Sequence, residues 1–471
     1  MVTVPLPAAP ISICRGSYES APARDPSAPR SVRPAGRSLT VMLDTDVLVI
    51  GGGPAGTAAA IELARAGRDV TLVDKATFPR DKCCGDGLTT GALRILEQLG
   101  FHPAMTPSWY DVDATWIRSP SGREVRLPMP SESGSYSAVV PRFELDDALL
   151  ALARAGGVKV DDGHAFQGFV PIGGDPVNGS DATGRDGDAV VAEIDGIGPV
   201  RARYVVAADG MWSPVRKALR LNEPDYLGEW HAFRQYIGNV TGPAAERQYV
   251  WFEDDLLPGY AWSFPLPGNR ANVGFGVLRN GERRIQSMKQ TWPDLLARPH
   301  IAEALGGGVV PEARHLAWPI PARIDRAALS RGRVLLVGDA ARATDPLTGE
   351  GIAQALITGV LAAEAIVAGG ALRPGLVRRR YEHEVHRHLF ADHRMSVVLG
   401  GLLRHRFAAR GSVRLAGLND WTRRNFARWL FEDEPRAIAF TPRRWHRGFL
   451  ARAGAWADDS APSSGPGSPD G

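Results

Sequence analysis

Residues 47–60 read VLVIGGGPAGTAAA, and this stretch decides the fold of the 471-residue chain. The apolar run at 46–50 is typical of a strand buried on both faces, and TAAAIELARAG after the glycines is a strong helix former. A second strand-like segment, DVTLVDK, follows at 69–75. A strand, a glycine-rich turn, a helix and another strand predict the first unit of an α/β domain built on a parallel sheet.

The glycines of this turn have the spacing of a dinucleotide-binding fingerprint. Gly51 allows the tight turn, Gly53 lets a pyrophosphate approach the backbone, and Gly56 lets the helix and strand pack closely. The N-terminus of the helix then faces the anion. Asp74 ends the next strand 23 residues after Gly51, where a carboxylate can accept a ribose hydroxyl. The pattern predicts a bound dinucleotide, and the alternative is a turn that binds nothing.

Composition argues against several other classes of protein. The net charge of +3 is small and no basic run appears, so we expect no nucleic-acid partner. Three cysteines cannot build a disulfide framework or a four-cysteine zinc site, so we expect no metal and a reducing, cytoplasmic location. The most apolar stretch, 351–372, is interrupted by Gln354 and Glu364, and we predict a buried helix there rather than a membrane span.

Two more strand-like runs end in acidic, glycine-containing turns. VVAADGMWSPVRK at 205–217 places Asp209 and Gly210 after a strand, and VLLVGDAARATDPLTGEGIAQAL at 334–356 places Gly338 and Asp339 after another. An aspartate there can accept from ribityl hydroxyls, and N–H groups at the next helix start can face an electron-rich ring edge. Each turn alone is common.

In this order, the three motifs resemble the FAD-dependent superfamily that includes aromatic hydroxylases, halogenases and geranylgeranyl reductases. Arg142 stands where that superfamily places an arginine near FAD, although a surface arginine is the alternative. The segment FPRDKCCGDGLTTGAL at 78–93 resembles the geranylgeranyl reductase family more narrowly. There, a cysteine before a glycine-rich turn lies beside the isoalloxazine, and Cys84 is the matching residue. PGYAWSFP at 258–265 resembles the Y-x-W-x-F-P segment that lines that family's substrate cavity, although such spacing also packs one face of an ordinary strand.

The resemblance implies FAD as the cofactor and a set of site residues. The candidate catalytic residues are Cys84, Tyr260 and Trp262. The candidate cofactor-binding residues are Gly51, Gly52, Gly53, Pro54, Ala55, Gly56, Asp74, Lys75, Cys84, Gly85, Asp86, Gly87, Arg142, Asp209, Gly210, Gly338, Asp339, Pro346, Gly349, Gly351 and Ile352.

The implied reaction saturates C=C bonds of a polyprenyl group, with hydride passing from reduced flavin to one alkene carbon and a proton reaching the other. The substrate class is a menaquinone tail, a geranylgeranyl lipid or a related isoprenoid. Two alternatives stay open: a flavin-dependent monooxygenase or halogenase, and a non-catalytic carrier of prenylated cargo. No second G-x-G-x-x-G unit appears, so the electron donor is NAD(P)H or a reductant protein such as ferredoxin.

The chain divides into an α/β, Rossmann-type FAD-binding domain, an inserted mixed or antiparallel β-sheet substrate domain and a C-terminal helical region. The predicted segments are 1–44 (disordered arm), 45–110, 141–220 and 325–375 (FAD-binding domain), 111–140 and 221–324 (substrate domain), 376–456 (C-terminal helical region) and 457–471 (disordered tail). Residues 401–456 hold twelve arginines and four acids with four interleaved tryptophans. Such a stretch fits peripheral contact with the inner face of the membrane, or an ordinary solvated helix pair.

Overall fold

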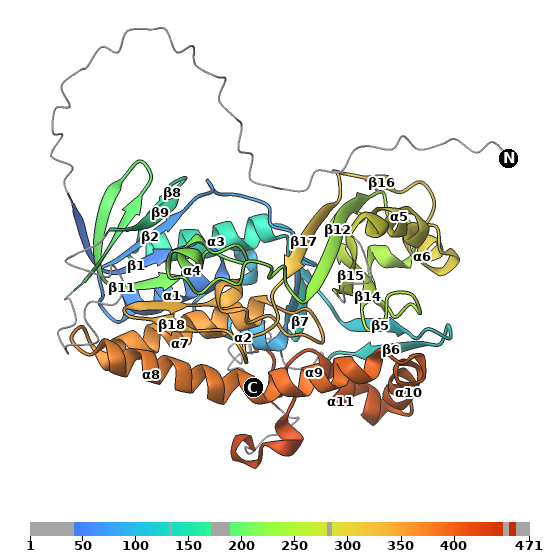
Figure 1. The fold of residues 1–471 in the computed structure, drawn as a ribbon. Coiled ribbons are helices and arrows are strands. Elements are labelled where there is room, and N and C mark those ends of the chain that lie inside the picture. Colours follow the sequence, from blue (N-terminus) through green and yellow to red (C-terminus); the bar gives the residue numbers. More distant parts are fainter. Residues whose placement is uncertain (1–41, 131–133, 171–188, 280–284, 446–451, 458–471) are drawn as a thin grey trace, which may run out of the picture.

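Three β-sheets organise the computed structural model, which describes residues 42–130, 134–170, 189–279, 285–445 and 452–457 (Figure 1). The strands of the first sheet are β1 (Leu43–Ile50), β2 (Val70–Asp74), β8 (Lys159–Asp162), β9 (Phe166–Val170), β10 (Val190–Ile194), β11 (Gly198–Ala207), β18 (Ser330–Arg331) and β19 (Val334–Leu336). Strands β19, β11, β1, β2 and β8 run parallel in that order. This parallel core confirms the predicted fold class and the strands expected at 46–50, 69–75, 202–210 and 333–341.

In the described part of the chain, four helices accompany this sheet, and those after β1 and β19 lie where the sequence predicts them. They are α1 (Pro54–Arg65), α3 (Arg142–Ala155), α4 (Pro214–Ala218) and α7 (Ile352–Gly369). Helices α1 and α7 approach closely, because a Cβ on Gly359 would lie 2.2 Å from the carbonyl oxygen of Ala55. Among the described residues, α7 alone is long and apolar enough to span a membrane, with a mean hydropathy of 1.8. It is 72% buried within the protein, which agrees with the predicted core helix.

The second sheet is largely antiparallel. Its strands are β5 (Ala114–Arg118), β6 (Glu124–Pro128), β12 (Trp230–Gly238), β13 (Gln248–Trp251), β14 (Tyr260–Leu266), β15 (Arg270–Leu278), β16 (Val310–Pro311) and β17 (Leu316–Ile320). Only β13 and β5 pair in parallel among its described strands. Helices α5 (Ile285–Leu296) and α6 (Pro299–Leu305) share a hydrophobic core with this sheet.

A small third sheet lies between the other two. It pairs β3 (Gly87–Thr89), β7 (Ser137–Val139) and β4 (Tyr110–Asp111), and α2 (Thr90–Gln98) follows β3 directly. The side chain of Thr89 caps α2 by accepting from the N–H of Ala92. The cysteine loop of 80–87 therefore enters the third sheet at its first strand.

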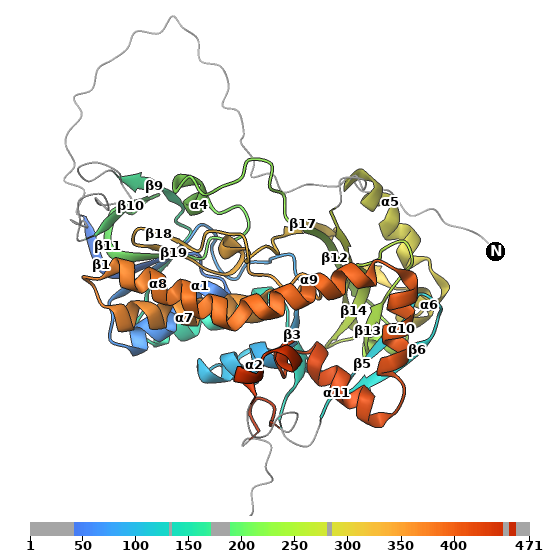
Figure 2. The same cartoon turned by 60° about the horizontal axis from the view of Figure 1, so that its bottom comes forward.

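The C-terminal helices cross the molecule. Helices α8 (Pro374–Val385) and α9 (Ala391–Leu403) are joined without a break by a π-helical turn, His386–Phe390. Figure 2 shows this long helix running from the side of the first sheet to the second sheet, where α10 (Arg406–Ala416) and α11 (Asp420–Leu430) lie. Regular helix ends at Leu430, earlier than predicted. Glu432 takes a left-handed φ of +58°, and only short 3₁₀ turns follow in the described residues.

The predicted domain division stays a prediction, although strands of the first two sheets fall within their expected segments. One boundary differs: the arm expected at 1–44 ends sooner, because Leu43 and Asp44 already pair with Val200 and Arg201. Residues 1–41, 171–188 and 458–471 lie outside the described residues.

Candidate active site

A cavity of about 890 Å³ lies at the carboxyl ends of the parallel strands, where the first sheet meets the second. Ligands of open α/β sheets bind at this edge. The turn after β1, the cysteine loop and the face of β14 line one part of the cavity. Strands β5, β6, β12, β13 and β17, the turns after β11 and β19, and helices α9, α10 and α11 line other parts of it. The cavity is thus shared by the first sheet, the second sheet and the C-terminal helices.

The turn after β1 has the geometry that a pyrophosphate needs. A Cβ on Gly51 would lie 2.3 Å from the carbonyl oxygen of Ala208, and one on Gly56 would lie 1.8 Å from that of Gly51. Gly53 is different, because the nearest heavy atom to a Cβ there is a terminal nitrogen of Arg80 at 3.6 Å. The N-terminus of α1 has no side-chain cap and no acidic residue in its first turn. Its N–H groups and the space over Gly53 fit the diphosphate of FAD.

Asp74 lies where the ribose is expected. Its Oδ2 accepts from the N–H of Gly52 at 2.7 Å, and its Oδ1 accepts from that of Ala76 at 2.8 Å. These bonds fix the carboxylate at the cavity wall, and each oxygen keeps a further lone pair. Asp74 is therefore held ready for a hydroxyl.

Most of the predicted cofactor residues line this one cavity. Gly52, Gly56 and Pro346 do not: Gly52 lies beside Phe78 and Leu150, and Gly56 lies against the turn itself. The residues that line it are Gly51, Gly53, Pro54, Ala55, Asp74, Lys75, Cys84, Gly85, Asp86, Gly87, Arg142, Asp209, Gly210, Gly338, Asp339, Gly349, Gly351 and Ile352. The structure therefore brings together positions that lie up to 301 residues apart, from Gly51 to Ile352.

Two of the acidic turns are already engaged by the protein. Asp209 accepts from the hydroxyl of Ser213 at 2.6 Å and from the N–H of Val215 at 2.9 Å, so its carboxylate caps α4. Burial raises the pKa of Asp209 to about 6. Asp339 pairs with Lys82 at 3.0 Å. A hydroxyl ligand would therefore share these carboxylates with partners that the sequence did not reveal.

The start of α7 differs from the expectation of free N–H groups. Glu350 accepts from the N–H groups of Ile352 and Ala353 at 2.8 and 2.9 Å through one oxygen, Oε1. The side chain lines the cavity as it does so. Glu350, between two predicted glycines, thus covers the helix end that we expected to face the ring, and nothing in its local sequence marks it for this position.

Cys84 lies on the cavity wall in a strongly polar setting. Arg142 interacts with its thiol and forms a bidentate pair with Asp146 at 2.8 and 2.9 Å. Arg142 is only 4% exposed, so it is not the surface arginine of the alternative interpretation. Burial raises the pKa of the Cys84 thiol, and burial raises that of Cys83 to about 12. Both thiols are neutral at pH 7, and both are free of disulfides.

Residues of the second sheet hold the cysteine loop in place. Asn272 donates to the carbonyl oxygen of Cys84 at 2.9 Å and to Asp86 at 2.7 Å, and Tyr236 donates to the same Asp86 oxygen at 2.6 Å. Arg234 donates to the carbonyl oxygen of Cys84 at 3.2 Å. Burial raises the pKa of Asp86 to about 6 in spite of these donors. Sequence reasoning missed this anchor, because nothing local to β12 or β15 marks its polar residues as partners of a distant loop.

The aromatic segment of β14 faces the same loop. Tyr260, Trp262 and Phe264 all line the cavity, and adjacent ring centroids are 6.1 and 6.2 Å apart. The indole of Trp262 donates to Asn272 at 3.1 Å, and the phenol of Tyr260 donates to the carbonyl oxygen of Thr348. Their polar atoms hold β15 and the turn before α7, while their rings form the wall. The arrangement suits a positioning role for both residues.

The far part of the cavity is apolar. The second sheet contributes Ile117, Val125, Leu127, Val250 and Phe252, and the C-terminal helices contribute Leu399, Leu402, Leu403, Val413, Leu415, Phe426 and Leu430. Leu402 and Leu415 are also exposed at the surface, at 53% and 63%. The apolar part therefore reaches the surface between α9 and α10. Among the described residues, no group of His, Cys, Asp and Glu could hold a metal ion.

Comparison with known proteins agrees with this geometry. The family model described as FAD binding domain matches residues 44–368. The menaquinone reductase of Mycolicibacterium smegmatis is 36% identical over 344 residues, which cover 69% of this chain and 77% of that protein. Digeranylgeranylglycerophospholipid reductase 1 of Methanopyrus kandleri is 33% identical over 69% of this chain and 81% of its own length. The chain belongs to the geranylgeranyl reductase family of FAD-dependent oxidoreductases.

Solved structures share the fold of this reductase family. A geranylgeranyl bacteriochlorophyll reductase-like protein from Thermoplasma acidophilum superposes with a TM-score of 0.69 at 21% identity, covering 86% of this chain and 100% of that one. The p-nitrophenol 4-monooxygenase of Pseudomonas putida superposes with a TM-score of 0.63 at 16% identity, covering 82% and 97%. At these identities the likeness concerns the fold alone.

Proposed function

We propose that this FAD-dependent reductase saturates C=C bonds of a polyprenyl chain, with an unsaturated menaquinone tail as the first substrate to test. The observation that carries the proposal is the continuity of the cavity. One part has the glycine turn, Asp74 and the cysteine loop of a flavin site, and the other is an apolar extension bounded by aliphatic side chains. A long hydrocarbon fits such a channel, since it offers no hydrogen bonds and gains about 25 cal/mol per Å² of surface removed from water.

Each part of the chain then has a task. When bound, reduced FAD supplies the hydride. Trp262 and Phe264 shape the wall beside the cysteine loop, because Gly85 and Gly87 leave room for their rings at 3.0–3.5 Å from where a Cβ would stand. The neutral Cys84 thiol forms an edge of the site that carries no charge against the substrate. The apolar walls hold the alkene close to the reductant and exclude water.

The test is anaerobic. Protein loaded with FAD is reduced by dithionite and mixed with a menaquinone that has an unsaturated tail, and the products are examined by mass spectrometry. We expect flavin reoxidation without oxygen and a product two mass units heavier. Reoxidation that requires oxygen and yields a hydroxylated or halogenated product would establish the monooxygenase or halogenase alternative. Protein that binds the prenyl compound but never oxidises the flavin would be a carrier.

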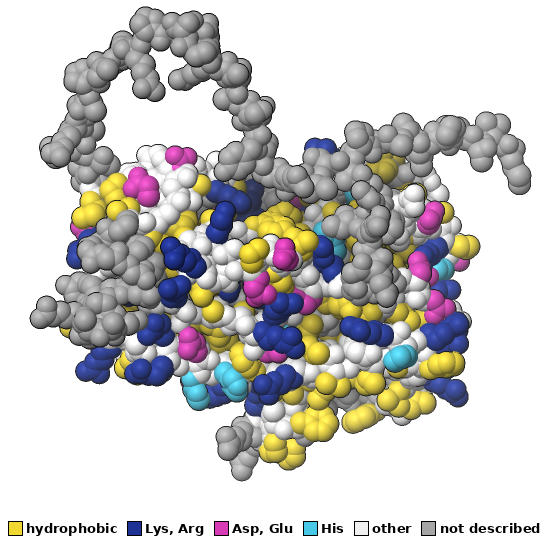
Figure 3. Space-filling view, in the orientation of Figure 1, with side chains coloured by type: hydrophobic (Ala, Val, Ile, Leu, Met, Phe, Trp, Pro, Cys, Tyr) yellow, Lys and Arg dark blue, Asp and Glu magenta, His cyan; other side chains and the backbone are white. Residues whose placement is uncertain are grey.

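We also propose that the protein docks on the inner face of an anionic membrane, from the cytoplasm, through the mouth of the apolar channel. Figure 3 shows hydrophobic side chains gathered along the edge formed by the C-terminal helices. The docking surface comprises the exposed residues Val397, Val398, Leu402, Phe407, Leu415, Leu418 and Trp421, and Arg404, Arg406, Arg414 and Arg424 lie exposed among them. Apolar side chains ringed by arginines suit an interface with anionic lipid headgroups. A tail could pass from the bilayer into the cavity beside Leu402 and Leu415.

Vesicle binding tests the docking surface. Phe407 and Trp421 are 79% and 65% exposed, and neither lines the cavity. Burying such a side chain contributes about 1.5–3 kcal/mol, so Phe407→Ser and Trp421→Ser should each weaken binding to phosphatidylglycerol vesicles about tenfold or more. Val310→Ser, at a 55% exposed position on β16, is the matched control and should bind like the parent. Equal binding by all three variants, or binding indifferent to salt, would refute the docking surface.

The electron donor is proposed to be NAD(P)H or a reductant protein such as ferredoxin. Anaerobic mixing of the oxidised holoprotein with each donor separates the two, since only the true donor bleaches the flavin at a catalytic rate.

A further inference from the structure

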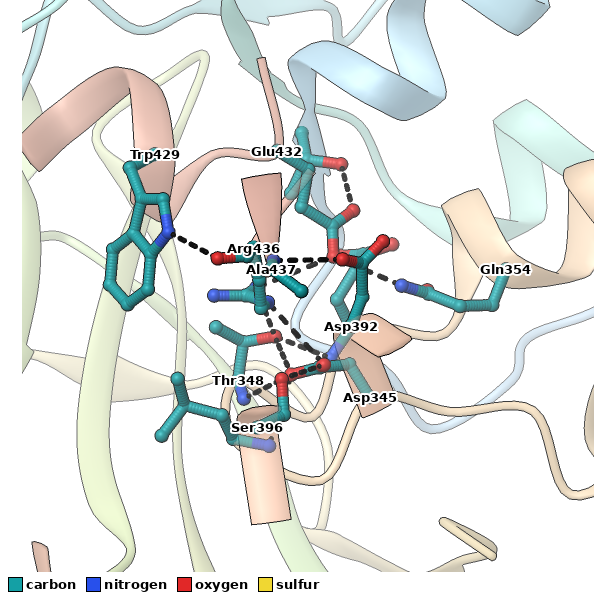
Figure 4. Close-up of polar contacts among 12 residues, drawn as sticks. Asp345, Thr348, Gln354, Asp392, Ser396, Trp429, Glu432, Arg436 and Ala437 are labelled. Carbon is teal, nitrogen blue, oxygen red and sulfur yellow. Dashed lines mark hydrogen bonds and ion pairs between the residues drawn. The ribbon is translucent and has the colours of Figure 1, made fainter. Parts of the chain in front are cut away.

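A cluster of buried charges lies beside the cavity, where the C-terminal segment meets the turn before α7. Figure 4 shows Arg436 between Asp345 and Glu432, with Thr348, Ser396 and Gln354 around them. Arg436 is 2% exposed on its side chain, 3.4 Å from Asp345 and 3.3 Å from Glu432. The cluster joins parts of the chain that no local motif connects.

The charges of this cluster do not balance if every acid is ionised. Asp345 is ionised at neutral pH. Burial alone would raise its pKa, but Arg436, Ser396 and backbone donors hold the pKa below its usual range. Asp392 pairs with Arg444 at 2.8 Å. Of the remaining carboxyls, Glu432 shares Arg436 with Asp345. Within the described residues Glu350 forms no ion pair and accepts only from backbone N–H groups.

Glu350 and Glu432, called the acid pair below, both bond to the N-terminal end of α7. Glu350 accepts from the N–H groups of Ile352 and Ala353, and Gln354 in the next turn donates to Glu432 at 3.0 Å. Burial first, and then mutual repulsion, raise the pKa of Glu350 to about 8, and burial raises the pKa of Glu432 as well. One proton is thus shared by the acid pair at neutral pH.

A second observation points to a proton in this place. Gln354 is buried, with 7% of its surface exposed, and its Oε1 has no hydrogen-bond partner within the described residues. An amide oxygen can only accept, so it awaits a donor. The amide already contacts Glu432 of the acid pair, and a protonated carboxyl can supply the missing donor whereas a carboxylate cannot.

The surroundings of Glu350 give that proton a use. The titratable groups that interact with it are Asp345 on its own turn, Glu432 on the C-terminal segment, Tyr260 on β14 and Cys84 on the cysteine loop. Arg436 faces Asp345 and Glu432 instead. Of the acid pair, only Glu350 lines the cavity. Burial raises the pKa of both Tyr260 and Cys84, which makes each of them a more reluctant proton donor than a carboxylic acid.

We propose that Glu350, kept protonated by its partner Glu432, is the catalytic acid that delivers the proton for alkene reduction. This inference rests on the proposed function, which supplies the hydride and its two electrons to one alkene carbon. The O–H bond of Glu350 breaks, its proton forms the C–H bond on the other carbon, and Glu350 is left as a carboxylate. A proton from water restores the acid pair before the next turnover.

The test compares Glu350→Gln and Glu432→Gln with Glu364→Gln, an exposed position on α7. The first readout is unfolding against pH, without substrate. The acid pair binds a proton in the folded protein that it loses when unfolded, so the folding constant of the parent falls by up to tenfold per pH unit between roughly pH 5 and 8. Glu350→Gln should flatten that decline relative to the parent, and Glu364→Gln should not. The raised pKa values of Asp86 and Asp209 also make the stability fall as pH rises. Both residues are present in every variant, so their effect cancels when the variants are compared.

The second readout is single-turnover alkene saturation by the FAD-loaded protein. Glu350→Gln should bind FAD with the parent affinity and saturate the alkene at least about 100-fold more slowly at pH 7. Glu432→Gln should move the alkaline loss of rate to lower pH, because removing the neighbouring charge lets Glu350 ionise sooner. A Glu350→Gln protein with the parent rate and the parent slope of stability against pH overturns the inference. A parent protein that saturates no alkene overturns the proposed function instead, and the unfolding comparison still reports on the acid pair.

Discussion

Substituting Gly53 by valine separates cofactor binding from folding more cleanly than any other change in the glycine turn. Gly53 has a φ of −79° and a ψ of −176°, which a β-branched residue adopts readily, and a Cβ there meets nothing closer than 3.6 Å. Replacing a glycine N-cap by an apolar residue costs about 1 kcal/mol at most. We therefore expect Gly53→Val to fold and to melt within a few degrees of the parent.

FAD binding should respond far more strongly. The valine methyl groups would occupy the space over the N-terminus of α1, which we assign to the diphosphate. Hydrogen bonds to a charged group contribute about 1.5–3 kcal/mol each, so losing two of them corresponds to a Kd raised at least about 100-fold. Fluorescence titration of the flavin-free protein measures this change directly.

Substitutions at two other glycines serve as controls. Gly168 on β9 has open space around a Cβ and lies outside the cavity, so Gly168→Val should keep the parent affinity. Gly56→Ala should fail to fold, because its Cβ would overlap the carbonyl oxygen of Gly51. If Gly53→Val purified with one FAD per chain at the parent Kd, the pyrophosphate would not lie over this turn.

Three further predictions concern the cysteine loop and its supports. Cys84→Ser should retain FAD at the parent affinity and slow alkene saturation by up to about tenfold, because a hydroxyl changes the polarity of the wall beside the reactants; unchanged single-turnover kinetics would remove the thiol from the reaction. Asn272→Ala should destabilise the protein by about 2–4 kcal/mol in urea unfolding, because Trp262, the Cys84 carbonyl and Asp86 each lose a buried partner, and a loss under 1 kcal/mol would contradict the anchor. Tyr236→Phe removes a donor that favours the charged form of Asp86, so the pKa of Asp86 should rise above about 6. The stability that protonated Asp86 contributes is present at low pH and is lost as pH rises through this pKa. In thermal melts that stability should therefore persist to higher pH in the variant than in the parent.

The sequence alone specifies the first sheet and the cofactor turn because their signals are local. The apolar run before Gly51 and the acid at Asp74 lie within one strand-helix-strand unit. In such a unit, the spacing of residues along the sequence predicts which of them lie close together in space. The turns at Asp209 and Asp339 are found equally well, since each follows its own strand. Their hydrogen-bond partners are not, because Lys82 reaches Asp339 across 257 residues of sequence.

The apolar channel and the acid pair lie beyond sequence reasoning for a different reason. The arginines and tryptophans of 401–456 attract attention, yet the aliphatic residues between them form the channel wall. Glu432 reaches α7 only because the chain turns with a left-handed φ after α11, and the residue type there gives no hint of it. Glu350 lies between Gly349 and Gly351 in the predicted cofactor turn. The glycines alone account for that turn, so the sequence gives no reason to assign a separate role to the residue between them.

The anchoring of the cysteine loop by Arg234, Tyr236 and Asn272 has a consequence for engineering. The wall beside the cofactor is built by one part of the chain but held by strands of another, so exchanging the second sheet for that of a relative would release the loop unless those three side chains came along. Chimaeras that alter prenyl-chain preference should therefore be cut within the C-terminal helices, which line the channel and do not carry these three side chains.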